Sequence, residues 1–154
     1  MTGAPFDCVV DASVGIKLFL VEPLSDEAHA LFAHLAVDPP ARFHVPDLFY
    51  IECTNDLWKY VRRLGLVEED ALLYIEQLGQ LALRSRPTAE LAADALDIAL
   101  KYDITAYDAA YVALSARLGV PLFTADKRLI RALAGAPFDV RWMGAIAMPL
   151  LPGA

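Results

Sequence analysis

Short apolar runs alternate with longer amphipathic patterns along the whole chain. Runs rich in β-branched and aromatic residues predict four buried strands, at 6–10, 43–46, 120–124 and 138–143. Apolar residues at helical spacing predict helices over 25–37, 47–64, 67–83, 88–102, 106–118 and 127–134, with an extended segment at 84–87. Strands that alternate with helices favour a parallel sheet, because each crossover lays a helix against the sheet. The predicted fold is α/β, with a central parallel sheet and helices on both faces.

The chain is predicted to form one domain that spans 1–154, because no repeat, low-complexity tract or long linker divides it. Ser25 is the predicted N-cap of the helix 25–37, and Gly65 the predicted end of the helix 47–64. Hydrophobic residues make up 57% of the chain. This fraction is high for a small monomer, so we expect an apolar surface, or the apolar tail 144–154, to pack against a partner or the domain.

Several classes of protein are disfavoured by what the sequence lacks. No apolar run reaches the ~18 residues of a membrane helix, and the start has no charged and apolar leader pattern, so the expected location is the cytoplasm without membrane contact. Cys8 and Cys53 do not have zinc-ligand spacing and are expected to be reduced and buried. His29, His34 and His44 also lack metal spacing and are expected to be ordinary surface or core residues.

Acidic residues stand at the ends of two predicted strands. Asp11 directly follows the first strand, and Asp126 comes two residues after the strand 120–124. Asp108 opens a helix, and Glu52 lies in the first half of an apolar helix. Ligands of open parallel sheets bind beyond the carboxyl ends of the strands. These acids are therefore candidates to converge on one edge of the sheet.

Each acid also has an ordinary structural explanation. Asp11 and Asp126 suit the N-caps of the helices that follow them. Thr105 and Asp108 match a capping box. Glu52 is harder to explain in this way, because a carboxylate within an apolar helix either reaches solvent or is offset by a cation.

Taken together, the four acids predict a site for a divalent cation. Carboxylates held close together repel, at about 4 kcal/mol for a pair ~4 Å apart in an effective dielectric of ~20. All-oxygen sites favour Mg²⁺ or Mn²⁺, and the chemistry that such sites support best is phosphodiester hydrolysis. The net charge of −7 argues against a protein that grips nucleic acid by bulk charge, although a loaded acidic site would itself be less negative.

Three segments carry a resemblance to a known family: VVDASV at 9–14, PDLFYIECTNDL at 46–57 and AYDAAYVALSARLGVPLFTADKRL at 106–129. They resemble the PIN-domain family and, within it, the VapC-like toxins of bacterial toxin–antitoxin pairs. The resemblance implies a parallel sheet of about five strands and a Mg²⁺- or Mn²⁺-dependent endoribonuclease. It assigns the catalytic and metal-binding roles to Asp11, Glu52, Asp108 and Asp126.

The resemblance also implies supporting residues and partners. Ser13 and Thr124 match hydroxyl positions that orient ligands or water, and Asn55 matches an asparagine beside Glu52. Lys127 and Arg128 are candidates for contacts to RNA phosphates, or are solvated surface residues. An antitoxin would lay a helix into an apolar groove, with the helices 25–37 and 47–64 as walls, and the toxin type is commonly a homodimer.

Two alternatives to the toxin remain open at this point. A PIN-type nuclease of RNA maturation or decay would carry the same acids without a toxin role. A non-catalytic module that binds nucleic acid or protein would use the acids only as caps and surface charges. The acidic character of the chain departs from RNA-cutting relatives with a clearer basic face, which leaves the extent of an RNA-binding surface open.

Overall fold

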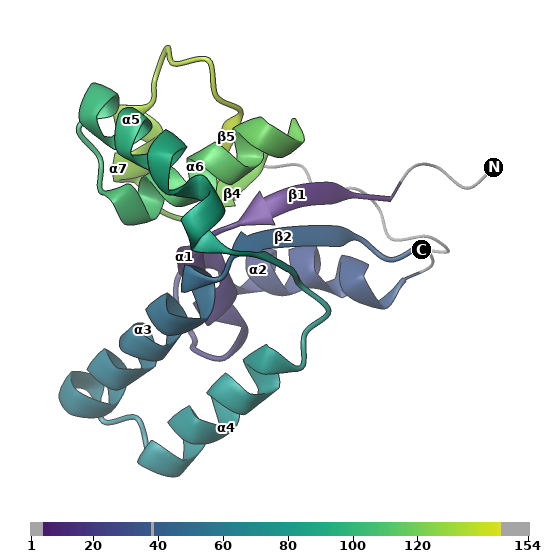
Figure 1. Cartoon of the computed structure of the whole chain (residues 1–154). Helices are drawn as coiled ribbons and strands as arrows, with labels where there is room; N and C mark the ends of the chain where they lie inside the picture. The colour runs from purple at the N-terminus through teal and green to yellow at the C-terminus, as the bar shows by residue number, and fades with distance from the viewer. Residues whose placement is uncertain (1–4, 38, 146–154) are drawn as a thin grey trace.

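A five-stranded parallel sheet forms the centre of the molecule, as the computed structural model shows for residues 5–37 and 39–145 (Figure 1). The strand order is β3-β2-β1-β4-β5. The strands are β1 (Asp7–Val10), β2 (Arg42–Pro46), β3 (Arg84–Arg86), β4 (Leu122–Thr124) and β5 (Val140–Trp142). The predicted α/β class and parallel sheet are confirmed.

The strand that the sequence did not predict is β3, which lies within the segment 84–87 that was expected only to be extended. Its backbone pairs with β2 in the register His44 to Arg84 and Pro46 to Arg86. All three of its residues are exposed at the edge of the sheet. Because an exposed edge strand needs no apolar side chains, the sequence carries no hydrophobic signal for it.

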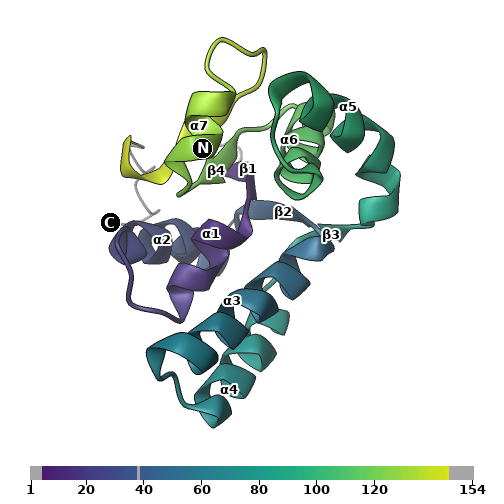
Figure 2. The same cartoon turned by 90° about the vertical axis from the view of Figure 1, so that its left-hand side faces the viewer.

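Helices cover both faces of the sheet, as predicted. They are α1 (Ala12–Gly15), α2 (Ser25–Phe32), α3 (Leu48–Leu64), α4 (Glu68–Gly79), α5 (Ala92–Tyr102), α6 (Ala106–Leu118) and α7 (Lys127–Ala132). α5, α6 and α7 lie on one side of the sheet, and α1 and α2 lie on the other (Figures 1 and 2). The hairpin of α3 and α4 projects from the rest of the molecule in both views.

Four of the predicted helices are shorter than expected. α4 ends at Gly79 and α7 at Ala132, and in the other two a 3-10 turn replaces one end. α2 stops at Phe32 and continues as a turn over Ala33–Ala36, while α5 is preceded by a turn over Thr88–Leu91. Ser25 is not the N-cap of α2. That position belongs to Leu24, whose φ is 72°, and the Ser25 hydroxyl instead donates to the Leu20 carbonyl at 3.0 Å. Gly65 ends α3 at φ 77°, as predicted.

The core places one helix deep inside the molecule. Every residue of α6 from Ala109 to Ser115 is buried, because the helix packs on β1, β2 and β4 on one side and on α5 on another. Such a helix is apolar around its whole circumference. It fixes the position of Asp108 in its first turn. Cys8 and Cys53 are free and buried, as expected.

The three histidines have ordinary surroundings. His34 and His44 are buried and His29 is exposed, so all three have the ordinary surroundings that their spacing predicted. Within the described ranges, no helix is long and apolar enough to cross a membrane. Most of the apolar tail, residues 146–154, lies outside the described part of the chain.

Candidate functional site

The strand order creates a crossover point between β1 and β4. The chain leaves β1 towards β2 on one side, and β4 pairs with β1 on the other side. The connecting helices change faces there, which opens the carboxyl ends of these two strands to a ligand. Asp11 directly follows β1, and Asp126 lies two residues beyond β4. The strand-end placement predicted for these two acids is confirmed.

Asp11 is a buried carboxylate, with 5% of its surface exposed. It caps α1 by accepting a hydrogen bond from the Val14 amide at 3.3 Å, and the Ser13 hydroxyl donates to the same oxygen. Its pKa is raised to about 6, mainly by burial; the charge of Asp108 acts in the same direction, and hydrogen bonds from Ser13 and Thr124 act in the opposite direction. Asp11 therefore does cap α1. Its ionised form is nevertheless unfavourable, because the carboxylate is buried and lies near the charge of Asp108.

Two hydroxyl groups join the loops that follow β1 and β4. The Ser13 hydroxyl accepts a hydrogen bond from the Ala125 amide at 3.0 Å and lies 3.4 Å from the Thr124 hydroxyl. The Thr124 hydroxyl accepts in turn from the Asp126 amide at 3.0 Å. These contacts fix the loops that carry Asp11 and Asp126 relative to each other.

Glu52 reaches from α3 to α6. The Tyr111 hydroxyl donates a hydrogen bond of 2.8 Å to Glu52 Oε1, which favours the ionised carboxylate. Burial is the larger effect and raises the Glu52 pKa to about 7, with the charges of Asp108 and Asp11 acting in the same direction. Asn55 is exposed on α3 one turn after Glu52, so its role stays a prediction.

Tyr111 is a residue of the site that the sequence did not single out. It follows Asp108 by three residues, which places both on one face of α6. That spacing was the only signal in the sequence. Its partner Glu52 is 59 residues away along the chain, so the hydrogen bond depends on the tertiary fold.

Asp108 and Asp126 complete the set of acids. The Asp108 amide donates to the Thr105 hydroxyl at 3.1 Å, which forms half of the predicted capping box. Burial raises the pKa of Asp108, and the charge of Asp126 raises it further. Asp126 caps α7 by accepting from the Arg128 amide at 2.9 Å. Asp108 thus interacts electrostatically with each of the other three acids.

The chemistry of these donors fits a hard divalent cation. All four are carboxylates. The charge of Asp108 raises the pKa values of Asp11 and Glu52, and the charge of Asp126 raises that of Asp108, which is the repulsion that a cation would relieve. Over 5–37 and 39–145, however, no three His, Cys, Asp or Glu side chains are arranged closely enough to hold a metal. Metal binding by these acids therefore stays a prediction, which the chemistry of the four carboxylates supports.

Lys127 and Arg128, the predicted phosphate contacts, are both exposed beside Asp126. Arg128 Nε lies 3.6 Å from Asp126 Oδ1. Lys127 Nζ lies over the ring of Trp142, 4.3 Å from its centroid. Trp142 is a second residue near the site that the sequence did not single out. It ends β5, so its contact with Lys127 of α7 depends on the tertiary fold.

The part of the chain that carries the four acids matches a known protein family. The family model described as PIN domain matches residues 8–135. Ribonuclease VapC3 of Pyrobaculum aerophilum is 41% identical over 123 residues, which are 79% of this chain and 90% of that protein. Among solved structures, Mycobacterium tuberculosis VapC20, described as a sarcin–ricin loop cleaving toxin, superimposes with a TM-score of 0.63 at 18% identity, over 85% of this chain and 95% of that one. A toxin–antitoxin complex from Klebsiella pneumoniae gives a TM-score of 0.59 at 17% identity, over 87% and 95% of the two chains.

Proposed function

Because this chain belongs to the PIN-domain family, we propose that it is a metal-dependent endoribonuclease that acts as the toxin of a toxin–antitoxin pair. The observation that carries the proposal is the position of its acids. Asp11 and Asp126 follow neighbouring parallel strands at the crossover point. The charge of Asp108 raises the pKa values of Asp11 and Glu52, and the charge of Asp126 raises the pKa of Asp108. The ribonuclease names of its relatives supply the reaction class.

In this proposal, Asp11, Glu52, Asp108 and Asp126 hold Mg²⁺ or Mn²⁺. The bound cation would supply positive charge at the scissile phosphodiester and lower the pKa of an attacking water. Ser13 and Thr124 hold the two strand-end loops together, so that Asp11 and Asp126 keep their separation. Tyr111 orients Glu52 and favours its ionised form, which is the form that binds a cation.

The proposed activity is tested by incubating the purified protein with pooled cellular RNA. We expect discrete cuts with Mn²⁺ or Mg²⁺ and none with EDTA, mapped by sequencing the new RNA ends. Cuts that persist in EDTA would contradict the metal dependence. Expression of the chain alone should arrest growth; RNA cleavage without arrest would assign the protein to RNA maturation or decay instead of a toxin role.

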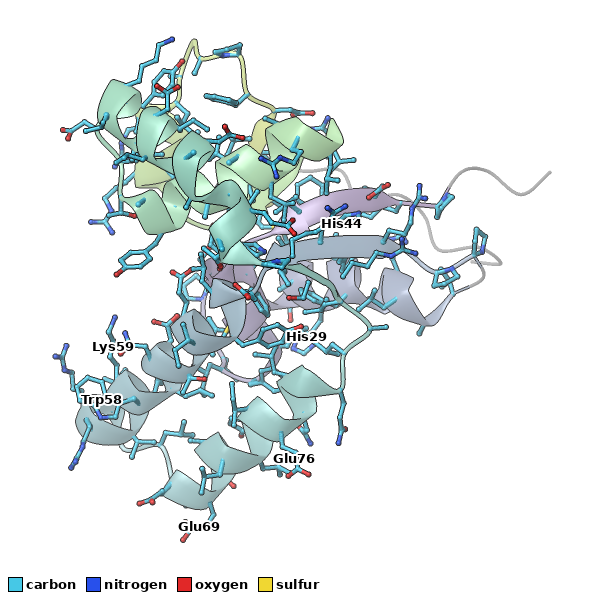
Figure 3. All side chains as sticks on the ribbon, viewed as in Figure 1. His29, His44, Trp58, Lys59, Glu69 and Glu76 are labelled. Atoms are coloured by element: carbon cyan, nitrogen blue, oxygen red, sulfur yellow. The ribbon has the colours of Figure 1, made fainter. Side chains whose placement is uncertain are left out.

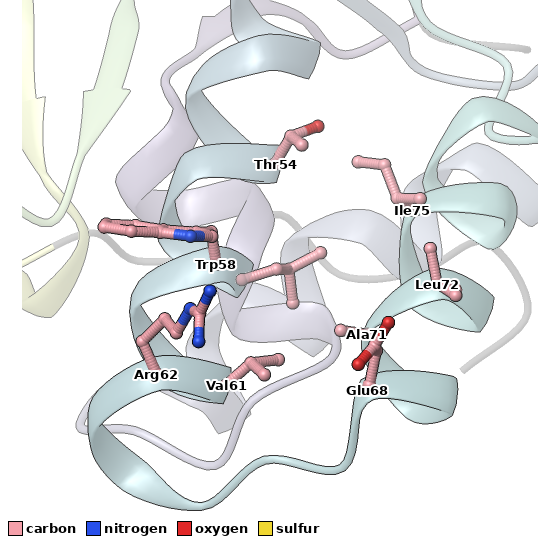
Figure 4. Close-up of a pocket in the computed structure, with 9 residues that line it drawn as sticks. Thr54, Trp58, Val61, Arg62, Glu68, Ala71, Leu72 and Ile75 are labelled. Atoms are coloured by element: carbon pink, nitrogen blue, oxygen red, sulfur yellow. The ribbon is translucent and has the colours of Figure 1, made fainter.

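We also propose an antitoxin as partner, a homodimer as the assembly, and the cytoplasm as the place of action. An apolar groove of about 340 Å³ runs between α3 and α4 (Figure 4). Its lining includes Leu57, Trp58, Val61, Leu72 and Ile75. Trp58 is 52% exposed and Leu72 is 62% exposed. Such a groove suits the apolar face of an antitoxin helix. Its walls are α3 and α4, whereas the sequence had suggested α2 and α3.

Changing Trp58 to Glu is expected to abolish the antitoxin complex without loss of RNA cleavage. Trp58 and Lys59 are exposed side chains of α3 (Figure 3). A charge in the groove would be buried without a partner by a docked apolar helix, at a penalty of several kcal/mol. Co-purification with a candidate antitoxin measures the complex. The matched control is Leu96→Glu, at an apolar position on α5 that is 56% exposed. If Trp58→Glu retained the partner as well as the control does, the groove would not be the docking surface.

A further inference from the structure

A second cavity adjoins the acids on the side of α7 and β5. It has a volume of about 450 Å³, within the usual range of ligand pockets. Its walls include Lys17, Pro23, Leu24, Asp126, Lys127 and Trp142. Arg128 also lines it, so three cations and one carboxylate face this space in a chain whose net charge is −7. Lys17 is paired with Glu22 and Arg128 with Asp126, whereas Lys127 lies over Trp142, so Lys127 is the cation that can meet an anionic ligand here.

The cations of this cavity are held in place by other side chains. Lys17 is 9% exposed, and its Nζ lies 3.0 Å from Glu22 Oε1. The Tyr60 hydroxyl bonds to the other oxygen of Glu22, which anchors this wall to α3. Leu24, on the same wall, has a φ of 72°, a conformation unusual for a leucine. This wall of the cavity is therefore a defined structure that the local network maintains.

Trp142 positions the second lysine. Lys127 Nζ lies 4.3 Å from the centre of the indole ring, within the range of a favourable cation–π contact. The ring itself packs against the backbone of Gly144, where an added Cβ would lie 2.3 Å from a ring atom. The indole is thus fixed from one side by the chain, and it holds the ammonium group of Lys127 at the cavity.

On the basis of the proposed ribonuclease activity, we propose that this cavity is an RNA subsite for the nucleotide next to the scissile phosphodiester. Lys127 contacts the phosphate of that nucleotide, and Lys17 contributes positive charge from the opposite wall. Pro23 and Leu24 give an apolar surface for the sugar or base. Trp142 is a positioning residue that acts through Lys127. The subsite explains how a chain with a net negative charge holds RNA at its acids.

Lys127→Ala tests the subsite in the cleavage of a short oligoribonucleotide that carries the mapped cut. Each phosphate contact to single-stranded RNA contributes about 0.7 to the slope of log affinity against log salt concentration. Loss of one contact therefore lowers the affinity gained between 1 M and 0.1 M salt by about fivefold. We therefore expect KM to rise about fivefold at ~0.1 M salt, with kcat within a factor of two and a shallower salt dependence of kcat/KM. Lys127→Arg should restore the wild-type values.

Trp142→Leu separates positioning from a structural role. If Trp142 acts through Lys127, its variant raises KM, and the double variant with Lys127→Ala is no worse than Lys127→Ala alone. Lys101→Ala is the matched control, because Lys101 lies over Tyr102 at 5.6 Å but does not line the cavity. Wild-type kinetics in Lys127→Ala would overturn the subsite and leave the ribonuclease proposal intact. A wild-type protein that cuts no RNA would overturn both.

Discussion

Asp11→Asn is expected to abolish RNA cleavage and yet raise the free energy of unfolding of the metal-free protein by about 1–3 kcal/mol at pH 8. Asp11 is 5% exposed, and burial raises its pKa to about 6. At pH 8 the folded protein must therefore hold a buried charge that the unfolded chain solvates. Asparagine has nearly the same shape, keeps an oxygen for the Val14 amide and is a good N-cap. It removes the charge and leaves the local fold.

Loss of activity in this variant has a separate cause. A neutral amide is a weaker ligand for a hard divalent cation than a carboxylate, so the variant would bind Mg²⁺ or Mn²⁺ poorly. In the proposed mechanism, the same group therefore destabilises the metal-free fold and enables the reaction. This opposition is typical of functional sites and is not expected of a residue whose only role is to cap a helix.

Urea unfolding in EDTA, beside cleavage assays with Mn²⁺, measures both effects in one set of variants. The matched control is Asp97→Asn, at an exposed position on α5, which should change neither quantity. A less stable Asp11→Asn protein would show that the carboxylate is mainly structural. Full cleavage by that variant would remove Asp11 from the catalytic set.

Much of the site could be predicted because its signals are local in the sequence. Asp11 adjoins an apolar run and Asp126 follows another, so strand prediction alone placed both at the ends of parallel strands. The helix that carries Glu52 was bounded correctly by Gly65, whose positive φ suits a glycine.

The parts that escaped prediction depend on contacts between distant segments. β3 forms by backbone pairing at an exposed edge, and so it needs no particular side chains. The bond from Tyr111 to Glu52 and the contact of Lys127 with Trp142 join separate elements. The helix α2 begins at Ser25, as predicted, but its N-cap is Leu24, which takes a conformation that a glycine or asparagine would usually occupy, so no sequence rule would choose Leu24 as the cap.

The metal-free protein is expected to lose stability as the pH rises from about 4 to about 7, by roughly 3 kcal/mol. The pKa of Asp11 rises from 3.8 to about 6 on folding, and that of Glu52 from 4.5 to about 7, in each case mainly through burial. Between these limits the folded protein binds more protons than the unfolded chain. Protonation therefore favours the folded state, and stability falls as these protons are lost.

Other acids modify this profile in known directions. The pKa values of Asp108 and Asp56 are also raised by burial, so both groups add to the loss of stability. Hydrogen bonds from Thr88 lower the pKa of Asp47, which favours the folded state as the pH rises through the more acidic part of the range. The net fall between pH 5 and pH 7 is then the contribution of the buried acids, since Asp47 is already ionised there.

Saturating Mn²⁺ is expected to reverse the slope, because the cation binds the ionised carboxylates and releases their protons. Melting temperatures measured from pH 5 to pH 8 test both predictions: a fall with rising pH in EDTA and a rise with pH in Mn²⁺. The double variant Asp11→Asn, Glu52→Gln should have a shallower profile in EDTA, with the contributions of Asp108 and Asp56 remaining, and little response to Mn²⁺. A wild-type melting temperature that rises with pH in EDTA would show that the acids are stabilised by the fold without a cation, and the metal site would then have no electrostatic basis.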